Sequence, residues 1–234
     1  MKKTIGIIGG MGPLATVKLF EKIVLYTRAE ADQDHPHTIV DSNTNIPDRT
    51  SFILQGGSNP IEELVKSAQR LKEAGADLLT MPCNTAHYFY DDITSSVDLP
   101  FINMIRETVR SIKNDFPESK VGLLSTSGTI ASGVYSKELQ REGIEYITPS
   151  GQHQEAVMEL IYNIKSGKYE SDLTGFYGAI DEMESSGATV VILGCTELSV
   201  ANDMYPLPES VAYVDPLRIL AKEAILQSGC DINT

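Results

Sequence analysis

Two of the three cysteines in this chain follow apolar runs that have the character of buried strands. Cys83 comes shortly after the run 76–81, and Cys195 comes shortly after the run 188–193. A Gly-Ala pair stands at the same distance before each cysteine, so the two segments align without a gap. Ligand sites in open α/β sheets lie beyond the carboxyl ends of the strands. The pattern therefore marks both cysteines as candidate functional residues.

A cysteine thiol has a pKa of about 8.5 in water, and amide donors at a helix amino terminus lower that pKa. A single activated cysteine would indicate nucleophilic catalysis, as in an amidase or a thiol protease, and would need a base nearby. His87 could tune Cys83 in this way, or it could lie on a helix face or cap a helix. Two cysteines facing one cleft favour a different chemistry. One thiolate removes a proton from a carbon while the opposed thiol delivers one to the other face, which inverts the stereocentre.

Strand and helix patterns alternate along the whole chain. Strands are expected at 4–8, 37–41, 76–81, 120–124 and 188–193, and helices at 14–29, 60–74, 106–115, 154–165, 176–185 and 216–227. A polar loop is expected at 42–49, and Phe101 begins another short strand or turn. Such alternation is typical of parallel sheets with right-handed crossovers.

The second half of the chain repeats the first. Residues 4–16 match residues 120–132, and the offset is nearly that of the two cysteine segments. This period is far longer than the roughly 20–50 residues of solenoid repeats, so it indicates duplicated α/β domains. We therefore expect two pseudo-symmetric, Rossmann-like domains with parallel sheets and a site in the cleft between them. The expected first domain is 1–98 plus 209–234, and the expected second domain is 99–208.

The composition restricts the classes of partner. A formal charge of −13 disfavours nucleic acid and anionic membranes, which are held mainly through Lys and Arg. No apolar run reaches the roughly 18 residues of a membrane span. Three cysteines without a Cys-x-x-Cys pair favour a reducing cytoplasm over a disulfide framework, and the four histidines show no metal-ligand spacing. An anionic substrate would need cations placed locally at its site.

Four motifs occur together in this chain. They are Ile-Ile-Gly-Gly-Met-Gly-Pro at 7–13, Pro-Asp-Arg at 47–49, Pro-Cys-Asn-Thr-Ala-His at 82–87 and Gly-Cys-Thr-Glu-Leu at 194–198. With these motifs in this order, the chain resembles the cofactor-independent aspartate/glutamate racemases, and among them most closely the aspartate racemases.

The resemblance implies an enzyme that interconverts L- and D-aspartate, with Cys83 and Cys195 as the two acid/base groups. It also implies two pseudo-symmetric α/β domains, a homodimer and no pyridoxal phosphate. Glutamate racemases of this superfamily usually carry His where this chain has Glu197, which favours the aspartate branch. Some relatives replace one cysteine by threonine, but this chain keeps both.

An acidic amino acid presents two carboxylates and an ammonium, and all three must be held to fix its Cα. Arg49 can bind a carboxylate bidentately, and Lys165 is a second cation from the other half of the chain. In the resembled family, the positions that match these two hold the side-chain carboxylate. Donors to the α-carboxylate, which stabilise a carbanion, are expected from Asn84, Thr85, Thr126, Ser127, Gly128, Thr129 and Thr196. Met11 and Glu197 complete the expected substrate-binding set; Glu197 would orient Thr196 or the ammonium, or be only a favourable first-turn carboxylate.

Several alternatives stay open at this point. Gly10-x-Gly12-x-x-Ala15 after a strand, with Asp41 ending the next strand, matches a dinucleotide-binding fingerprint. The copy at 125–128 lacks the first glycine, and a nicotinamide site explains neither cysteine. Related two-cysteine enzymes include glutamate or broad-specificity racemases, maleate isomerases and malonate decarboxylases. A binding protein with an inactive site is a further alternative.

Overall fold

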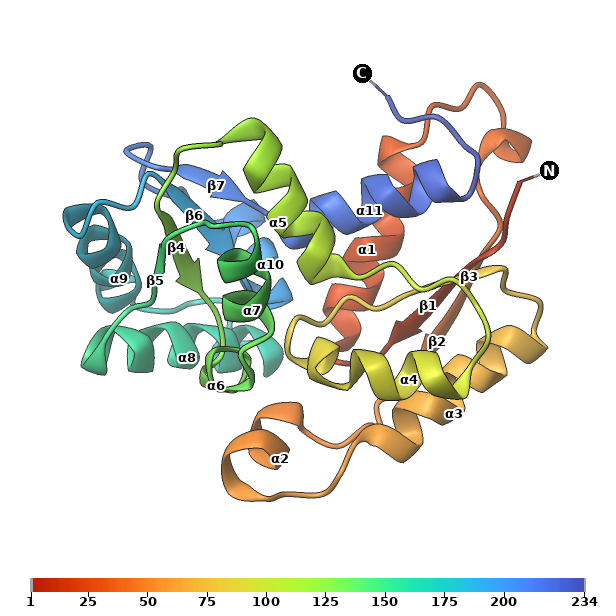
Figure 1. Cartoon of the computed structure of the whole chain (residues 1–234), viewed down its shortest axis with the longest axis horizontal. Coiled ribbons are helices and arrows are strands. Elements are labelled where there is room, and N and C mark those ends of the chain that lie inside the picture. The colour runs from red at the N-terminus through yellow and green to blue at the C-terminus, as the bar shows by residue number, and fades with distance from the viewer. Residues whose placement is uncertain (1, 234) are drawn as a thin grey trace.

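The computed structural model describes residues 2–233 and contains two α/β domains (Figure 1). The first domain is built on a parallel sheet of strand order β2-β1-β3, formed by β1 (Ile5–Gly9), β2 (Thr38–Ser42) and β3 (Leu78–Thr80). The second domain is built on a parallel sheet of order β5-β4-β6-β7, formed by β4 (Val121–Leu124), β5 (Tyr146–Ile147), β6 (Val190–Leu193) and β7 (Ala212–Val214). The two-domain α/β fold expected from the sequence is confirmed.

The duplication is visible in how the central strands pack. A Cβ on Gly6 of β1 would lie 2.9 Å from a side-chain atom of Leu79 and 3.3 Å from one of Leu71. A Cβ on Gly122 of β4 would lie 2.7 Å from Met183 and 3.3 Å from Val191. In both domains the missing side chain lets one helix and the neighbouring strand approach the central strand closely. The two glycines that align in sequence thus have the same packing role.

Helices cover both faces of each sheet. Those of the first part of the chain are α1 (Pro13–Tyr26), α2 (Arg49–Gln55), α3 (Ile61–Glu73), α4 (Tyr90–Ser96) and α5 (Met104–Asp115), with short 3-10 turns η1 (Asp32–Asp34) and η2 (Thr85–Phe89). Those of the remainder are α6 (Ser127–Ser132), α7 (Val134–Arg141), α8 (Gly151–Lys165), α9 (Thr174–Ser185), α10 (Thr196–Met204) and α11 (Pro216–Gln227). No helix within residues 2–233 is long and apolar enough to cross a membrane.

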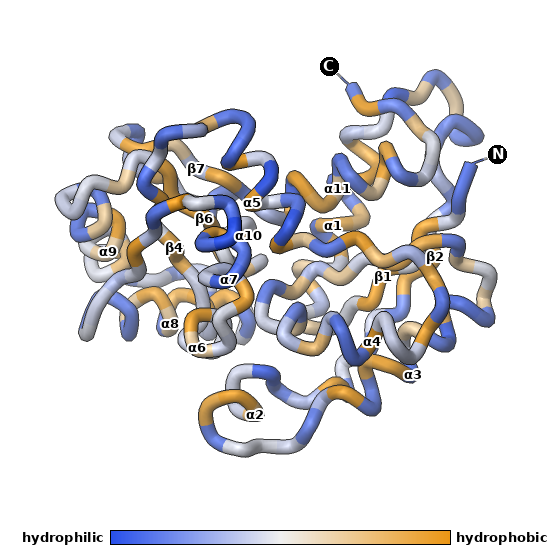
Figure 2. The backbone as a smooth tube through the Cα atoms, in the orientation of Figure 1, coloured by the Kyte–Doolittle hydropathy of each residue, from blue (hydrophilic) through white to orange (hydrophobic). Residues whose placement is uncertain are grey.

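Each sheet separates two apolar clusters, and Figure 2 shows apolar residues both on the strands and on the helices that cover them. Ile5 and Ile7 of β1 pack toward α1 and α11, whereas Ile8 packs toward α3 and α4. In the second domain, Val121 and Leu123 of β4 pack toward α5 and α7, and Leu124 packs toward α8 and α9. The strands β1, β3, β4 and β6 are buried on both faces, which explains why their residues read as apolar runs.

The structure contains β5, β7, α4 and α7, which are not among the elements expected from the sequence. Three further differences concern α2 and the bounds of the domains. Residues 49–55 form helix α2, capped by the Asp48 side chain that accepts from the Ser51 amide, where only a loop is expected up to residue 49. Strand β7 pairs with β6 of the second sheet, although the expected boundaries assign 209–234 to the first domain. Phe101 forms a parallel bridge with Leu79 of the first sheet, although 99–208 is assigned to the second domain. The other bounds of the domains stay a prediction.

Candidate active site

The two cysteines predicted to act together line the same small cavity between the domains. Cys83 follows β3 of the first domain and Cys195 precedes α10 of the second, and each side chain is 6% exposed. Both thiols are free. The cavity, called here the inner cavity, measures about 10 Å³, close to the smallest space that holds one water molecule. It is lined by Met11, Asp48, Arg49, Thr50, Cys83, Asn84, Thr85, Lys165, Cys195, Thr196 and Glu197.

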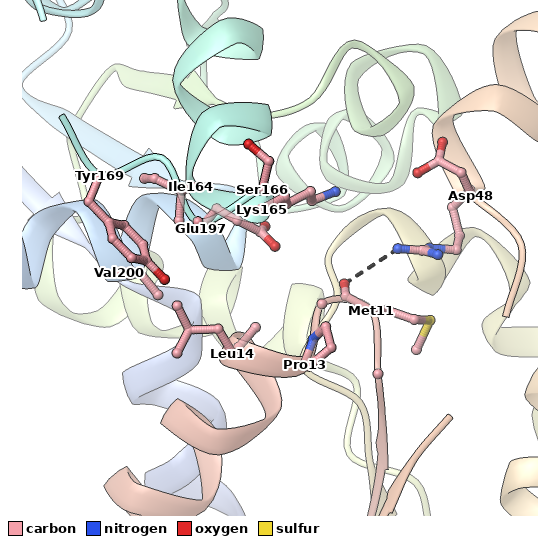
Figure 3. Close-up of a pocket in the computed structure, with 15 residues that line it drawn as sticks. Met11, Pro13, Leu14, Asp48, Ile164, Lys165, Ser166, Tyr169, Glu197 and Val200 are labelled. Atoms are coloured by element: carbon pink, nitrogen blue, oxygen red, sulfur yellow. Dashed lines mark hydrogen bonds between the residues drawn. The ribbon is translucent and has the colours of Figure 1, made fainter. Parts of the chain in front are cut away.

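A larger cavity of about 490 Å³ adjoins the inner cavity (Figure 3). We call it the outer cavity. It lies between the β1–α1 loop, the start of α2 and the end of α8, and five of its lining residues also line the inner cavity. These shared residues are Met11, Asp48, Arg49, Lys165 and Glu197. The shared residues stand at the junction, so a ligand that enters through the outer cavity passes them before it reaches the thiols.

Cys195 is coupled to a buried carboxylate. Its Sγ donates to Oε2 of Glu197 at 2.9 Å, and Glu197 lies in the first turn of α10 with 5% of its surface exposed. Burial and the negative charge of Glu197 raise the pKa of the Cys195 thiol well above its ordinary value, and the positive charge of Lys165 opposes this shift. Cys195 therefore holds its proton at neutral pH, and the Glu197 carboxylate is within hydrogen-bond distance to accept it.

Arg49 is a buried cation that forms no ion pair with an acidic side chain of residues 2–233. Its guanidinium donates to three backbone carbonyls, those of Ile46, Pro47 and Met11, and the last contact is the dashed line in Figure 3. Only 7% of the residue is exposed, and Nε has no hydrogen-bond partner among the described residues. A buried charge without a counterion is costly unless a bound anion compensates it. Arg49 is therefore placed to bind an anion at the junction.

Lys165 supplies the second cation from the end of α8. Its ammonium lies 5.3 Å from the centre of the Tyr162 ring. Desolvation lowers the pKa of Lys165, but the carboxylate of Glu197 and the two cysteine sulfurs in their thiolate form raise it by more, so the net shift is upward. Figure 3 shows Lys165 and Glu197 on one side of the outer cavity and Met11 and Asp48 on the other. The junction is thus bounded by charged groups from both domains.

The expected hydroxyl donors divide into two groups. Asn84, Thr85 and Thr196 line the inner cavity. Thr126 and Thr129 do not line either cavity, because their hydroxyls form a hydrogen-bonded triangle with that of Thr85, with O···O distances of 2.8–3.1 Å. These two threonines support Thr85 from the second domain.

Ser127 and Gly128 also lie outside both cavities. The Ser127 hydroxyl accepts from Nε2 of Gln154, and a Cβ on Gly128 would lie 2.6 Å from the Thr50 hydroxyl. This segment packs against α2 instead of lining the cavity in this structure. Of the expected substrate-binding set, the structure therefore brings seven residues to the two thiols and leaves four behind them.

His87 holds a structural position. Its Nδ1 lies 2.8 Å from the Cys83 carbonyl oxygen, and its Nε2 accepts from the amide of Met104, the first residue of α5. The Nδ1 proton is therefore donated to the carbonyl, and the ring caps α5 in its neutral form. Burial lowers the pKa of His87 to about 4, and the nearby charge of Arg106 adds to this. The contact to Cys83 is through the backbone, not through the thiol.

Sequence reasoning missed three residues of the site. Asp48 lines both cavities, Thr50 lines the inner one, and Tyr135 donates to Oδ1 of Asn84 at 2.7 Å. Asp48 belongs to the Pro-Asp-Arg motif, which could have indicated it. Thr50 directly follows the same motif, but it lies in helix α2, which the polar sequence of this segment did not predict. Nothing in the sequence around Tyr135 separates it from an ordinary core tyrosine.

Comparison with known proteins identifies the family of this chain. Residues 8–224 match the family model described as Asp/Glu/hydantoin racemase. The chain belongs to this family. Because the match covers most of the chain, both domains and both thiols of the cavity lie inside it.

Individual relatives cover this racemase almost end to end. The aspartate racemase of Picrophilus torridus superposes with a TM-score of 0.87 and 30% identity over 99% of this chain and 96% of that chain. An aspartate racemase homologue from Pyrococcus horikoshii OT3 gives a TM-score of 0.77 and 27% identity over 98% and 100%. The broad specificity amino-acid racemase RacX of Bacillus subtilis (strain 168) is 29% identical over 94% of this chain and 96% of its own.

Proposed function

We propose that this racemase interconverts L- and D-aspartate by a two-base mechanism through Cys83 and Cys195. The observation that carries the proposal is that the two free thiols, one from each domain, line one cavity. The similarity to the Picrophilus torridus aspartate racemase supports the choice of substrate.

In the proposed mechanism the substrate Cα lies between the two sulfur atoms. One thiolate removes the α-proton, and the opposed thiol delivers a proton to the other face. The roles exchange when the opposite enantiomer enters. Cys195 in its resting thiol form is the proton donor on its side, and Glu197 is the acceptor that takes its proton when Cys195 must act as the base. The reaction then needs no pyridoxal phosphate and no metal ion.

The charges at the junction fit an amino diacid. Arg49 and Lys165 would hold the side-chain carboxylate, because both border the passage between the cavities and Arg49 has no acidic partner among the described residues. Asn84, Thr85 and Thr196 then face the α-carboxylate. Donors at that position stabilise the carbanion because negative charge moves onto the carboxylate oxygens as the proton leaves.

A broad-specificity amino-acid racemase is the second candidate. The outer cavity of about 490 Å³ is of the size that holds drug-sized ligands and exceeds what aspartate requires. Its wall includes the apolar side chains of Leu14, Ile164 and Val200. The similarity to RacX of Bacillus subtilis points in the same direction. Turnover of amino acids with long side chains would separate this candidate from an aspartate-specific enzyme.

We also propose that the enzyme works as a homodimer in the cytoplasm. The resemblance to the aspartate racemases supports the dimer, and three free cysteines fit a reducing compartment. Helix α1 exposes Val17, Phe20 and Val24, which have the i, i+3, i+7 spacing of one helix face. A second copy that covers this face would remove the apolar surface from water.

Proton exchange in deuterated water tests the mechanism. Each aspartate enantiomer should exchange its α-hydrogen, and Cys83→Ala or Cys195→Ala should lower racemisation at least ~10³-fold, since each removes one of two obligatory proton carriers. Cys230→Ala is the matched control, because Cys230 is buried in the apolar cluster under α11 and lines neither cavity. Chiral chromatography measures the racemisation. Racemisation that persists in both Cys83→Ala and Cys195→Ala would rule the two-base mechanism out.

A further inference from the structure

A buried tyrosine of the second domain contacts an asparagine of the first. Tyr135 lies in α7, is 1% exposed, and donates its hydroxyl proton to Oδ1 of Asn84 at 2.7 Å. Asn84 directly follows Cys83 and is 2% exposed. The hydrogen bond therefore connects the two domains immediately beside one of the thiols.

This contact determines which end of the Asn84 amide is available. Asn84 lines the inner cavity, whereas Tyr135 does not. With Oδ1 held by the tyrosine, Nδ2 has no hydrogen-bond partner among the described residues although it is buried. An unpaired buried N–H₂ group costs free energy unless a ligand accepts its protons. The amide is thus prepared as a donor.

We propose that Tyr135 is a positioning residue that fixes the Asn84 amide with its N–H₂ end toward the substrate α-carboxylate. The inference rests on the proposed function, since it assigns the anion that Nδ2 meets. A phenol hydroxyl must find an acceptor when buried, so it selects the amide oxygen. Without it the amide can rotate by half a turn and place its oxygen against the carboxylate, which repels it.

The surroundings of Tyr135 keep it a donor. Burial raises its pKa further above the ordinary value, so the hydroxyl is protonated at neutral pH. The hydroxyl donates to Oδ1 of Asn84 at 2.7 Å. Because Tyr135 and Asn84 come from different domains, the orientation holds only while the domains stay together.

The first experiment compares Tyr135→Phe with Tyr90→Phe. Tyr90 is the matched control, because its hydroxyl also donates to an oxygen of the first domain, the Phe101 carbonyl at 2.9 Å, but lines neither cavity. Tyr135→Phe should lower kcat/KM for aspartate by roughly 10- to 100-fold, mainly in kcat, since a donor to a developing charge is lost. Tyr90→Phe should stay within about 3-fold of the wild type. Equal activities of the two variants would overturn the proposal.

The second experiment asks whether Tyr135 acts through Asn84. In an Asn84→Ala background, Tyr135→Phe should cause no further loss, because the group that it orients is gone. Losses that simply multiply would overturn the proposal. If Tyr135→Phe does not fold, Asn84→Ala alone decides, and wild-type kcat/KM in that variant would contradict the role.

Binding of succinate separates this inference from the proposed function. Succinate has two carboxylates but no stereocentre, so calorimetry reports the orientation of Asn84 without turnover. The dissociation constant should rise about 10-fold in Tyr135→Phe and in Asn84→Ala, but not in Tyr90→Phe. If the four proteins bind succinate with this pattern of dissociation constants but the wild type does not racemise aspartate, only the proposed function is contradicted. An equal dissociation constant in all variants, or no binding by the wild type, would sink the positioning role.

Discussion

Glu197 is the residue whose charge most directly affects one of the thiols. After burial, its carboxylate is the main cause of the raised Cys195 pKa, and the two groups share a hydrogen bond. Glu197→Gln removes the negative charge, so the pKa of Cys195 should fall. In a Cys83→Ala, Cys230→Ala background, the pH dependence of alkylation by iodoacetamide should therefore move to lower pH.

Asp48→Asn is the control for this measurement. Asp48 also lines the inner cavity, but it is not among the groups that shift the Cys195 pKa. Its replacement should leave the alkylation profile in place. An unchanged profile in Glu197→Gln, or one moved to higher pH, would contradict the coupling.

In the proposed function, Arg49 gives the enzyme its preference for a substrate with a side-chain carboxylate. Arg49→Ala should raise KM for aspartate by roughly 10- to 100-fold, because a charged hydrogen-bonding partner of the side-chain carboxylate is lost. Alanine has no such carboxylate and should be affected much less, if it is turned over at all. Steady-state kinetics with both substrates checks this. The control is Arg70→Ala, which removes a half-exposed guanidinium paired with Asp41 and should leave the KM values for both substrates unchanged. If Arg49→Ala keeps the wild-type preference for aspartate over alanine, Arg49 is excluded from the specificity pocket.

At the scale of elements, the loop after β3 is held by the helix that follows. His87 accepts from the amino terminus of α5 and contacts the carbonyl of Cys83, so one neutral ring fixes both the Cys83 loop and the amino terminus of the helix. The histidine has a structural role here, and in the proposed mechanism the cysteines and Glu197 carry the protons.

His87 should make stability depend on pH. Its pKa is about 4 in the folded protein and about 6.5 in an unfolded chain, so the unfolded state binds the proton more readily between these values. Stability should therefore fall as pH decreases from 6.5 to 4, by about 3 kcal/mol from this group. Urea unfolding of the wild type and of His87→Gln, which keeps a donor and an acceptor but does not titrate, isolates the effect. Parallel pH dependences in the two proteins would refute the assignment.

At the scale of the whole molecule, contacts between the domains keep the two thiols facing one cavity. Helix α11 packs against both α1 and α5, and Lys18 and Lys22 of α1 lie 3.7 and 3.8 Å from Asp203 of α10. Figure 1 shows α5 and α11 between the two sheets. Packed helices thus close one side of the cleft between the domains. The outer cavity lies on the side from which the cleft remains accessible.

The proposed homodimer can be tested on α1. Phe20 is 42% exposed in the middle of the apolar face, and a carboxylate there would be buried without a partner in the dimer. Phe20→Glu should therefore shift the protein from dimer to monomer in size-exclusion chromatography with light scattering. Leu226→Glu is the control, because Leu226 is similarly exposed at 46% but lies on α11. A dimer that survives Phe20→Glu would place the interface elsewhere.

The sequence by itself determined the parallel sheets, the duplication and the pair of strand-end cysteines. These features are local, because apolar runs, glycine breaks and helix periodicity are written in consecutive residues. The helix at Pro216–Gln227 matches its predicted range, and the other helices and strands that were predicted lie within a few residues of theirs, whereas β5 and β7 were not predicted. Arg49 and Lys165 were indicated by the resemblance to the racemases, and the structure places both in the lining of the inner cavity.

Only the tertiary structure decided which polar groups reach the thiols. Thr126 and Thr129 look equivalent to Thr85 in sequence, yet their hydroxyls are used in supporting it. Tyr135 and Asn84 are far apart in the chain and meet because the two domains pack together. Hydrogen-bond partners across such an interface depend on how two folded surfaces fit, and this fit is not encoded in any single stretch of residues.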